Sequence, residues 1–157
     1  MSTATDDGIL RAPHTMEYPY RRSLGSVLSR FFTGLRDGKI EANKTADGRV
    51  LMPPMEYDPE TGEDISDDWV EVGPGGEVKS WTWIAEPRSC HPSETPFAYA
   101  LIQLDGADVP FLNVVRADNE AAMSTGMRVT VEWAEERSGG ITDIAGFVPA
   151  SNPARGA

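Results

Sequence analysis

A chain of 157 residues with 39% hydrophobic and 25% charged residues is typical of one soluble globular domain, alone or with a small appendage. The net charge of −11 argues against nucleic-acid binding, because phosphate backbones repel an acidic protein. No apolar run approaches the roughly 20 residues that span a bilayer. The N-terminus also lacks a secretion signal, so we expect a cytoplasmic protein without a membrane contact.

The front of the chain predicts an arm followed by one helix. Residues 1–17 are polar and without periodicity, which predicts a flexible arm. Residues 18–39 contain a predicted helix from Ser23 to Asp37, with Ser23 as the N-cap and Gly38 as the residue after its end. One helix face is apolar, at Leu24, Val27, Leu28, Phe31, Phe32 and Leu35.

This face either packs on the protein's own core or docks on a partner subunit, and the pattern leaves both interpretations open. If it docks, the partner-binding residues are Leu24, Leu28, Phe31, Phe32 and Leu35. Near the helix the chain also carries a group of basic residues, Arg21, Arg22, Arg30, Arg36, Lys39 and Lys44.

Residues 40–75 are rich in turns. Val50–Met52 predicts a short strand before the Pro53-Pro54 pair, and Trp69–Val72 predicts another before Gly73–Gly76. Between them lies a stretch with no basic residue, which holds Glu56, Asp58, Glu60, Glu63, Asp64, Asp67 and Asp68. Its spacing does not match an EF-hand loop, so we interpret it as a solvated acidic turn and not as a calcium site.

Residues 76–150 have the pattern of β-strands. Five are predicted, at Val78–Ala85, Phe97–Leu104, Val109–Val115, Arg128–Glu135 and Ile141–Val148. A helical turn at residues 118–125 separates the third from the fourth, which is the layout of an OB-fold barrel. Trp81 and Trp83 share one face of the first strand, where we expect core or interface packing. Residues 151–157 predict a frayed tail.

The sequence offers no self-contained catalytic site. The single cysteine, Cys90, excludes both an intramolecular disulfide and a thiolate zinc site. His91 follows it directly, and adjacent side chains on an extended segment point to opposite sides, so mutual activation is not expected. The other histidine, His14, lies in the predicted arm, and no Ser-His-Asp triad can be assembled.

The chain contains, in order, the segments FFTGLRDGKI, ADGRVLMPP, GGEVKSWTWI, PFAYALIQLDG and TGMRVTVEW. This succession resembles the two-part zinc-ribbon/OB-fold proteins that are associated with thiolases. The resemblance covers Tyr18 to Pro149 and rests on the order and spacing of all five segments. It implies a mainly β fold with an N-terminal helix, a rubredoxin-like ribbon at residues 40–75 and a five-stranded OB-fold barrel.

The ribbon departs from the family pattern. The two Cys-x-x-Cys pairs of the family fall here on Lys44, Asp47, Asp58 and Thr61, which are not a zinc ligand set. We therefore expect a degenerate, metal-free ribbon, ordered by a partner or by the barrel. The apolar residues available to hold it are Val50, Met52, Met55, Tyr57 and Trp69. A partly exposed pair of Lys44 with Asp47 or Asp58 adds little stability.

The resemblance also implies a function. Members of the family are small acyl-CoA-associated subunits of thiolase-like condensing enzymes and aldolases, whose substrates include acyl-CoA side chains of steroids. We expect a non-catalytic accessory subunit without a cofactor, in a hetero-oligomer with a thiolase-like protein whose acyl-CoA site it supports. The candidate contacts to coenzyme A or to the partner are Arg21, Arg22, Arg30, Arg36 and Lys39.

Two other hypotheses about the function stay open. One is a free-standing OB-fold module that binds single-stranded nucleic acid or another ligand. The other is an enzyme that uses Cys90 or the acidic stretch.

Overall fold

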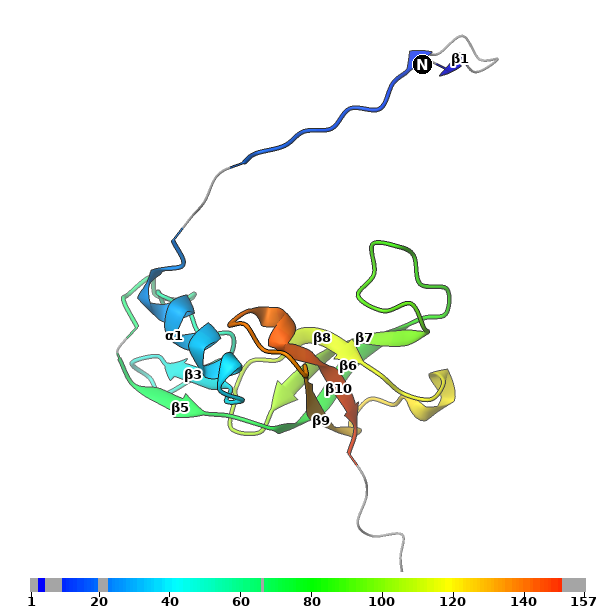
Figure 1. Ribbon diagram of the computed structural model, residues 1–157. Coiled ribbons are helices and arrows are strands. Elements are labelled where there is room, and N and C mark those ends of the chain that lie inside the picture. Colours follow the sequence, from blue (N-terminus) through cyan, green and yellow to red (C-terminus); the bar gives the residue numbers. More distant parts are fainter. Residues whose placement is uncertain (1–2, 5–9, 20–22, 66, 151–157) are drawn as a thin grey trace, which may run out of the picture.

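The computed structural model describes residues 3–4, 10–19, 23–65 and 67–150, and every structural statement below refers to these residues (Figure 1). In the N-terminal arm, strand β1 (Thr3–Ala4) pairs antiparallel with β2 (Leu10–Arg11). The arm extends away from the folded body in Figure 1. The predicted tail at residues 151–157 lies outside the described residues. No helix in the described part of the chain is long and apolar enough to cross a membrane.

The predicted helix is confirmed as α1 (Gly25–Arg36), and its C-terminal end has the expected chemistry. The Gly38 N–H donates to the carbonyl of Leu35 at 3.0 Å, and the Lys39 N–H donates to the carbonyl of Gly34 at 2.8 Å. These two bonds form a Schellman motif, which is why a glycine with a φ of +77° stands at position 38.

The predicted N-cap is wrong. The N-cap is Leu24, and no side-chain hydrogen bond closes this end of the helix. Because Gly25 has a φ of +76°, the helical backbone cannot continue toward Ser23, whose hydroxyl therefore does not cap α1.

The ribbon is a three-stranded sheet with β3 (Glu41–Lys44) between β4 (Val50–Leu51) and β5 (Trp69–Glu71). Both neighbours run antiparallel to β3. Beyond β4, an antiparallel bridge between Tyr57 and Asp64 closes a second, short hairpin. The ribbon therefore includes two hairpin loops, residues 45–49 and residues 57–64, which meet where Arg49 contacts Glu60.

The barrel holds the ribbon in place. The Val50 N–H donates to the Asp108 carboxylate at 2.8 Å, and the Asp108 N–H donates to the Val50 carbonyl at 3.0 Å. One continuous hydrophobic core joins Phe31 of α1 and Met52 of the ribbon to the barrel. We expected either a partner or the barrel to order the ribbon. These contacts show that the barrel of the same chain packs against the ribbon and bonds to it.

The barrel itself is closed and five-stranded. Its strands are β6 (Gly75–Ile84), β7 (Phe97–Leu104), β8 (Phe111–Val115), β9 (Arg128–Trp133) and β10 (Ile144–Pro149). Their order is β10-β8-β7-β6-β9, with β8 and β10 parallel and the other pairs antiparallel. A short 3-10 helix, η1 (Glu120–Ala122), separates β8 from β9. The predicted OB-fold is confirmed.

Two barrel strands begin three residues away from their predicted starts, and the other barrel-strand boundaries differ by at most two residues. The first barrel strand begins at Gly75 and includes two glycines that the pattern of apolar residues does not mark as strand. At Gly76 the backbone lies so close to β7 that a Cβ would stand 2.8 Å from the Gln103 carbonyl, and only glycine permits this approach. The last strand begins at Ile144, because the preceding residues Ile141–Asp143 form a 3-10 helix, η2.

Asp143 explains this turn. Its buried carboxylate accepts hydrogen bonds from the backbone N–H groups of Ser138 at 3.0 Å, Gly139 at 2.8 Å and Gly140 at 3.2 Å. Burial, the largest single influence, raises the pKa of this group. The three hydrogen bonds and Arg137 together outweigh burial, and the pKa lies below the ordinary value of 3.8.

We expect Asp143→Asn to lower the melting temperature at pH 7, because an amide accepts these bonds more weakly than a carboxylate. A depressed pKa stabilises the fold above the unfolded-state pKa, and this contribution is lost as the pH falls through the folded-state pKa. The difference between variant and wild type should therefore shrink below about pH 4. Thermal unfolding across this pH range, with the exposed Asp118→Asn as the control, measures it. A difference that does not change with pH would contradict the assignment.

Candidate partner-binding surface

Large apolar side chains stay exposed along one side of the body. We call this set the apolar face, and it consists of Leu24, Met55, Tyr57, Val109, Leu112 and Ile141, which are between 38% and 62% exposed. The residues come from the start of α1, from the ribbon and from the barrel. Soluble monomers rarely expose large contiguous apolar patches, and such patches mark interaction sites.

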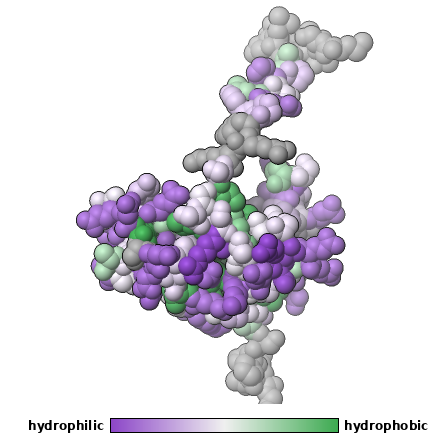
Figure 2. Space-filling model, turned by 60° about the vertical axis from the view of Figure 1, so that its left-hand side comes forward, coloured by the Kyte–Doolittle hydropathy of each residue, from purple (hydrophilic) through white to green (hydrophobic). Residues whose placement is uncertain are grey.

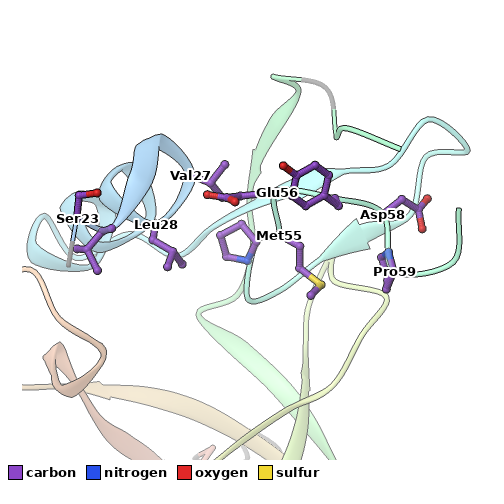
Figure 3. Close-up of a pocket in the computed structure, with 10 residues that line it drawn as sticks. Ser23, Val27, Leu28, Met55, Glu56, Asp58 and Pro59 are labelled. Atoms are coloured by element: carbon purple, nitrogen blue, oxygen red, sulfur yellow. The ribbon is translucent and has the colours of Figure 1, made fainter. Parts of the chain in front are cut away.

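A groove of about 560 Å³ lies between α1 and the ribbon. It is lined by Ser23, Leu24, Val27, Leu28, Pro54, Met55, Glu56, Tyr57, Asp58 and Pro59. Figure 3 shows Val27 and Leu28 on the helix side of the groove, and Met55 and Pro59 on the ribbon side. Hydrophobic side chains also appear in Figure 2 just below the arm, among largely hydrophilic neighbours.

A second groove of about 350 Å³ continues the first one onto the barrel. It is lined by Leu51, Met52, Pro53, Met55, Pro59, Val109, Pro110, Phe111, Leu112 and Ile141. Met55 and Pro59 belong to both grooves, so the two form one continuous surface. The two charged residues in the lining, Glu56 and Asp58, are both acidic. A partner that covers this surface should therefore be apolar, with cations at the edge of its contact area.

Asn43 of β3 fixes Met55 at the centre of this surface. Its buried side chain donates to the Met55 carbonyl at 2.7 Å and accepts from the Met55 N–H at 3.2 Å. The amide therefore pairs with Met55 as a neighbouring strand would, and it holds the loop that follows the proline pair.

We expect Asn43→Ala to destabilise the fold by about 1–3 kcal/mol, because it leaves the two polar groups of Met55 without these partners. Chemical denaturation measures this loss. The conservative Asn43→Asp variant retains the acceptor and loses the donor, so it should show part of the loss. An unchanged stability of Asn43→Ala would show that solvent replaces both bonds.

The predicted partner-binding helix face divides in the structure. Phe31 and Leu35 are 1% and 0% exposed and belong to the core, so neither can contact a partner in this fold. Phe32 packs partly against the same core. Leu24 is exposed and Leu28 is half-buried, and both line the first groove. The core interpretation therefore holds for the C-terminal half of α1, and a docking role is left to the N-terminal half.

The sequence did not indicate the other members of the apolar face. Met55 and Tyr57 were expected to hold the ribbon together, yet they are 46% and 56% exposed. An available signal was their position among acidic residues and prolines, where apolar side chains have few neighbours to pack against. Val109, Leu112 and Ile141 gave no separate signal, since each fits a strand pattern.

The basic residues are only partly free. Arg21 and Arg22 lie outside the described residues. Arg30 is engaged, because it donates to Glu41 at 2.9 Å and its guanidinium lies 4.4 Å from the ring centre of Trp69. Arg36 and Lys39 are exposed at the other end of α1, away from the residues that line the first groove.

The four ribbon positions that the resemblance assigns to zinc ligands do not fit zinc. Lys44 lies 3.5 Å from Asp68, instead of pairing with either carboxylate considered above, and Thr61 is exposed. Asp47 and Asp58 both receive hydrogen bonds from Arg49. Among the residues that the structure describes, no group of three or more His, Cys, Asp or Glu side chains is arranged to hold a metal ion.

The remaining chemical candidates are dispersed. Cys90 is exposed in the long loop between β6 and β7. The His91 ring accepts from the Arg88 N–H at 2.9 Å and packs edge-on against Phe97 and Tyr99, which is a structural role. Trp81 and Trp83 pack against the core, as expected.

Comparison with known families supports the barrel assignment. Residues 69–134 match the family model described as "ChsH2, C-terminal OB-fold domain". This match is consistent with the resemblance for the barrel, and the structural neighbours below share its fold. The search of curated proteins gave no match.

Two solved structures share the fold. One chain, described as "Ltp2-ChsH2(DUF35) aldolase", is 21% identical with a TM-score of 0.60, and the likeness covers 83% of this chain and 100% of that chain. The other is a protein of unknown function from the DUF35 family of Sulfolobus solfataricus, which is 23% identical with a TM-score of 0.56. That likeness covers 69% of this chain and 77% of the other. At these identities the likeness establishes the fold.

Proposed function

We propose, from a barrel of the ChsH2 C-terminal OB-fold type, that this chain is a non-catalytic accessory subunit of a thiolase-like enzyme. The observation that carries the proposal is the continuous apolar face, which joins helix, ribbon and barrel and is covered by nothing in the chain described. The similar solved chain belongs to an aldolase described by two components, Ltp2 and ChsH2, which supports a partner of that class.

The chemistry we propose for the complex is bond making or breaking next to an acyl-CoA thioester, including the retro-aldol cleavage of steroid side chains. The catalytic groups belong to the partner, because the histidine and the cysteine in the β6–β7 loop are not arranged as an acid-base or nucleophilic pair. For contacts to coenzyme A phosphates this chain offers Arg36 and Lys39, which are exposed.

The direct test is reconstitution with the purified thiolase-like partner. We expect the chain alone to show no turnover of an acyl-CoA substrate, and the mixture to exceed the partner alone at least tenfold. Full turnover by this chain alone would instead establish it as the enzyme. A salt-dependent shift of a labelled oligonucleotide, without any effect on the partner, would favour the nucleic-acid-binding module.

We expect Arg36→Ala with Lys39→Ala to raise the KM for acyl-CoA of the reconstituted complex several-fold and to leave kcat unchanged, if these side chains meet coenzyme A phosphates. Lys79→Ala, which removes a lysine on β6, is the matched control. An unchanged KM in the double variant would restrict the role of this chain to supporting its partner.

A further inference from the structure

The guanidinium of Arg49 joins the two hairpin loops of the ribbon. Its Nε donates to Asp47 at 3.0 Å, within the first loop. Its Nη1 donates to Glu60 at 2.8 Å, and its Nη2 lies 3.1 Å and 3.2 Å from the two carboxylate oxygens of Asp58, both in the second loop. A single planar cation thus binds three carboxylates from two segments of chain.

The inner part of this cluster is shielded from water. The side chain of Asp58 is 8% exposed and that of Arg49 is 28% exposed, whereas Glu60 is 71% exposed. Thr45, which is 4% exposed, donates its hydroxyl to Asp47 and accepts the Arg49 N–H at 3.0 Å. Buried charges persist only where they are paired, and Arg49 is the cation that pairs with Asp58, whose carboxylate also accepts the Glu60 N–H at 2.8 Å.

The electrostatics agree with this geometry. The hydroxyl of Thr45, and after it the contacts from Arg49, hold the pKa of Asp47 below its usual value. The bond to Asp47 is the first cause that raises the pKa of Arg49. Both groups are therefore charged at neutral pH, and their attraction is present under ordinary conditions.

Asp47 and Asp58 stand at two of the four positions that the resemblance stated for the sequence assigns to zinc-binding cysteines. We infer that Arg49 takes the structural place of the metal in this chain, as the cation that ties the two ribbon loops together. The exchange has defined consequences. A guanidinium cluster is unaffected by a chelator, whereas a zinc ribbon unfolds with one. It is weakened by salt, which screens partly exposed charges.

The cluster also positions the partner-binding surface, a step that rests on the proposed function. Asp58 stands between Tyr57 and Pro59, and all three line the first groove. The Asp58 N–H donates to the Glu63 carbonyl at 2.8 Å, so the hairpin moves with this residue. Arg49 does not line either groove, and its effect on a partner is therefore indirect, through the position of the second loop.

The test is hydrogen exchange of backbone amides in the full chain, with Arg49→Ala, Arg49→Lys and, as the control, Arg88→Ala, which removes another exposed arginine. We expect Arg49→Ala to speed exchange of the Asp58 and Gly62 amides at least tenfold. Both donate hydrogen bonds within the second loop, at 2.8 Å each. The exchange rates of Arg49→Lys should lie between those of the wild type and Arg49→Ala. Lysine keeps the positive charge but lacks the planar set of N–H donors that binds three carboxylates at once. A chelator should leave the wild type unchanged, and 1 M salt, where the Debye length is about 3 Å, should speed the same amides.

Unchanged exchange in Arg49→Ala, or a wild type loosened by chelator, would overturn the inference whether or not a partner is found. Where Arg49→Ala does not fold, Glu60→Gln makes the same comparison, because it removes only the outer contact, and we expect about a threefold effect. If exchange changes as expected but partner affinity does not, the Arg49 cross-link stands and its role in docking is refuted.

Discussion

Leu24→Asn combined with Met55→Gln is expected to weaken binding of the thiolase-like partner about a hundredfold, while the melting temperature stays within about 2 °C of the wild type. Each apolar side chain contributes about 1.5–3 kcal/mol when it is fully buried, and 2.7 kcal/mol corresponds to a factor of about a hundred. Both residues are about half exposed in the free chain, so their loss costs little folding energy. Titration calorimetry with the purified partner measures the affinity.

The double variant separates docking from folding. Leu24 has helical φ and ψ angles and its side chain makes no capping hydrogen bond, so the substitution removes no bond from the helix N-terminus. Met16→Gln is the matched control, because Met16 is a 65% exposed methionine on the arm and not on the apolar face. Equal affinities of the double variant and Met16→Gln would remove the apolar face from the interface.

Phe31→Ala is expected to destabilise the protein by about 3–5 kcal/mol, which corresponds to a fall in melting temperature of about 10 °C. The ring is 1% exposed, lies 5.4 Å from the ring of Phe32 and belongs to the core shared by helix, ribbon and barrel. Truncation therefore leaves a cavity where all three parts meet. Denaturant unfolding measures the change in stability.

Leu28→Ala on the same helix is the comparison for Phe31→Ala. Leu28 is half-buried beside the open groove, and water can occupy the space that its truncation leaves, so we expect a loss of only about 1 kcal/mol. Equal losses at the two positions would contradict the division of α1 into a core half and a docking half.

The sequence predicts most of the fold because the decisive signals are local. The positive φ at Gly38 and the apolar period of α1 are properties of a few neighbouring residues. The same holds for the alternating pattern of the barrel strands. Two of the errors arise from local backbone geometry that the apolar pattern does not reveal. Gly25 turns the chain and removes Ser23 from the helix N-terminus, and the buried carboxylate of Asp143 makes a turn out of what reads as the start of a strand.

The candidate surface is less predictable from the sequence because it is assembled from distant segments. Leu24 and Ile141 belong to one face, although 116 residues separate them in the chain. Periodicity shows which helix face is apolar, but it does not show which half of that face the core covers. For this reason the sequence could not tell that Phe31 is buried and that Leu28 lines the groove. The sequence shows that no cysteine stands in the ribbon, whereas the role of Arg49 requires the geometry of both loops.

The association that we propose between this chain and a thiolase-like protein can be measured directly. The most direct measurement is purification of the tagged full chain from its native cell extract, with the retained proteins identified and quantified by mass spectrometry. We expect a thiolase-like protein in near-equal amount to the bait, and a smaller amount with the Leu24→Asn/Met55→Gln chain. Recovery of the chain alone, or with nucleic acid, would contradict it.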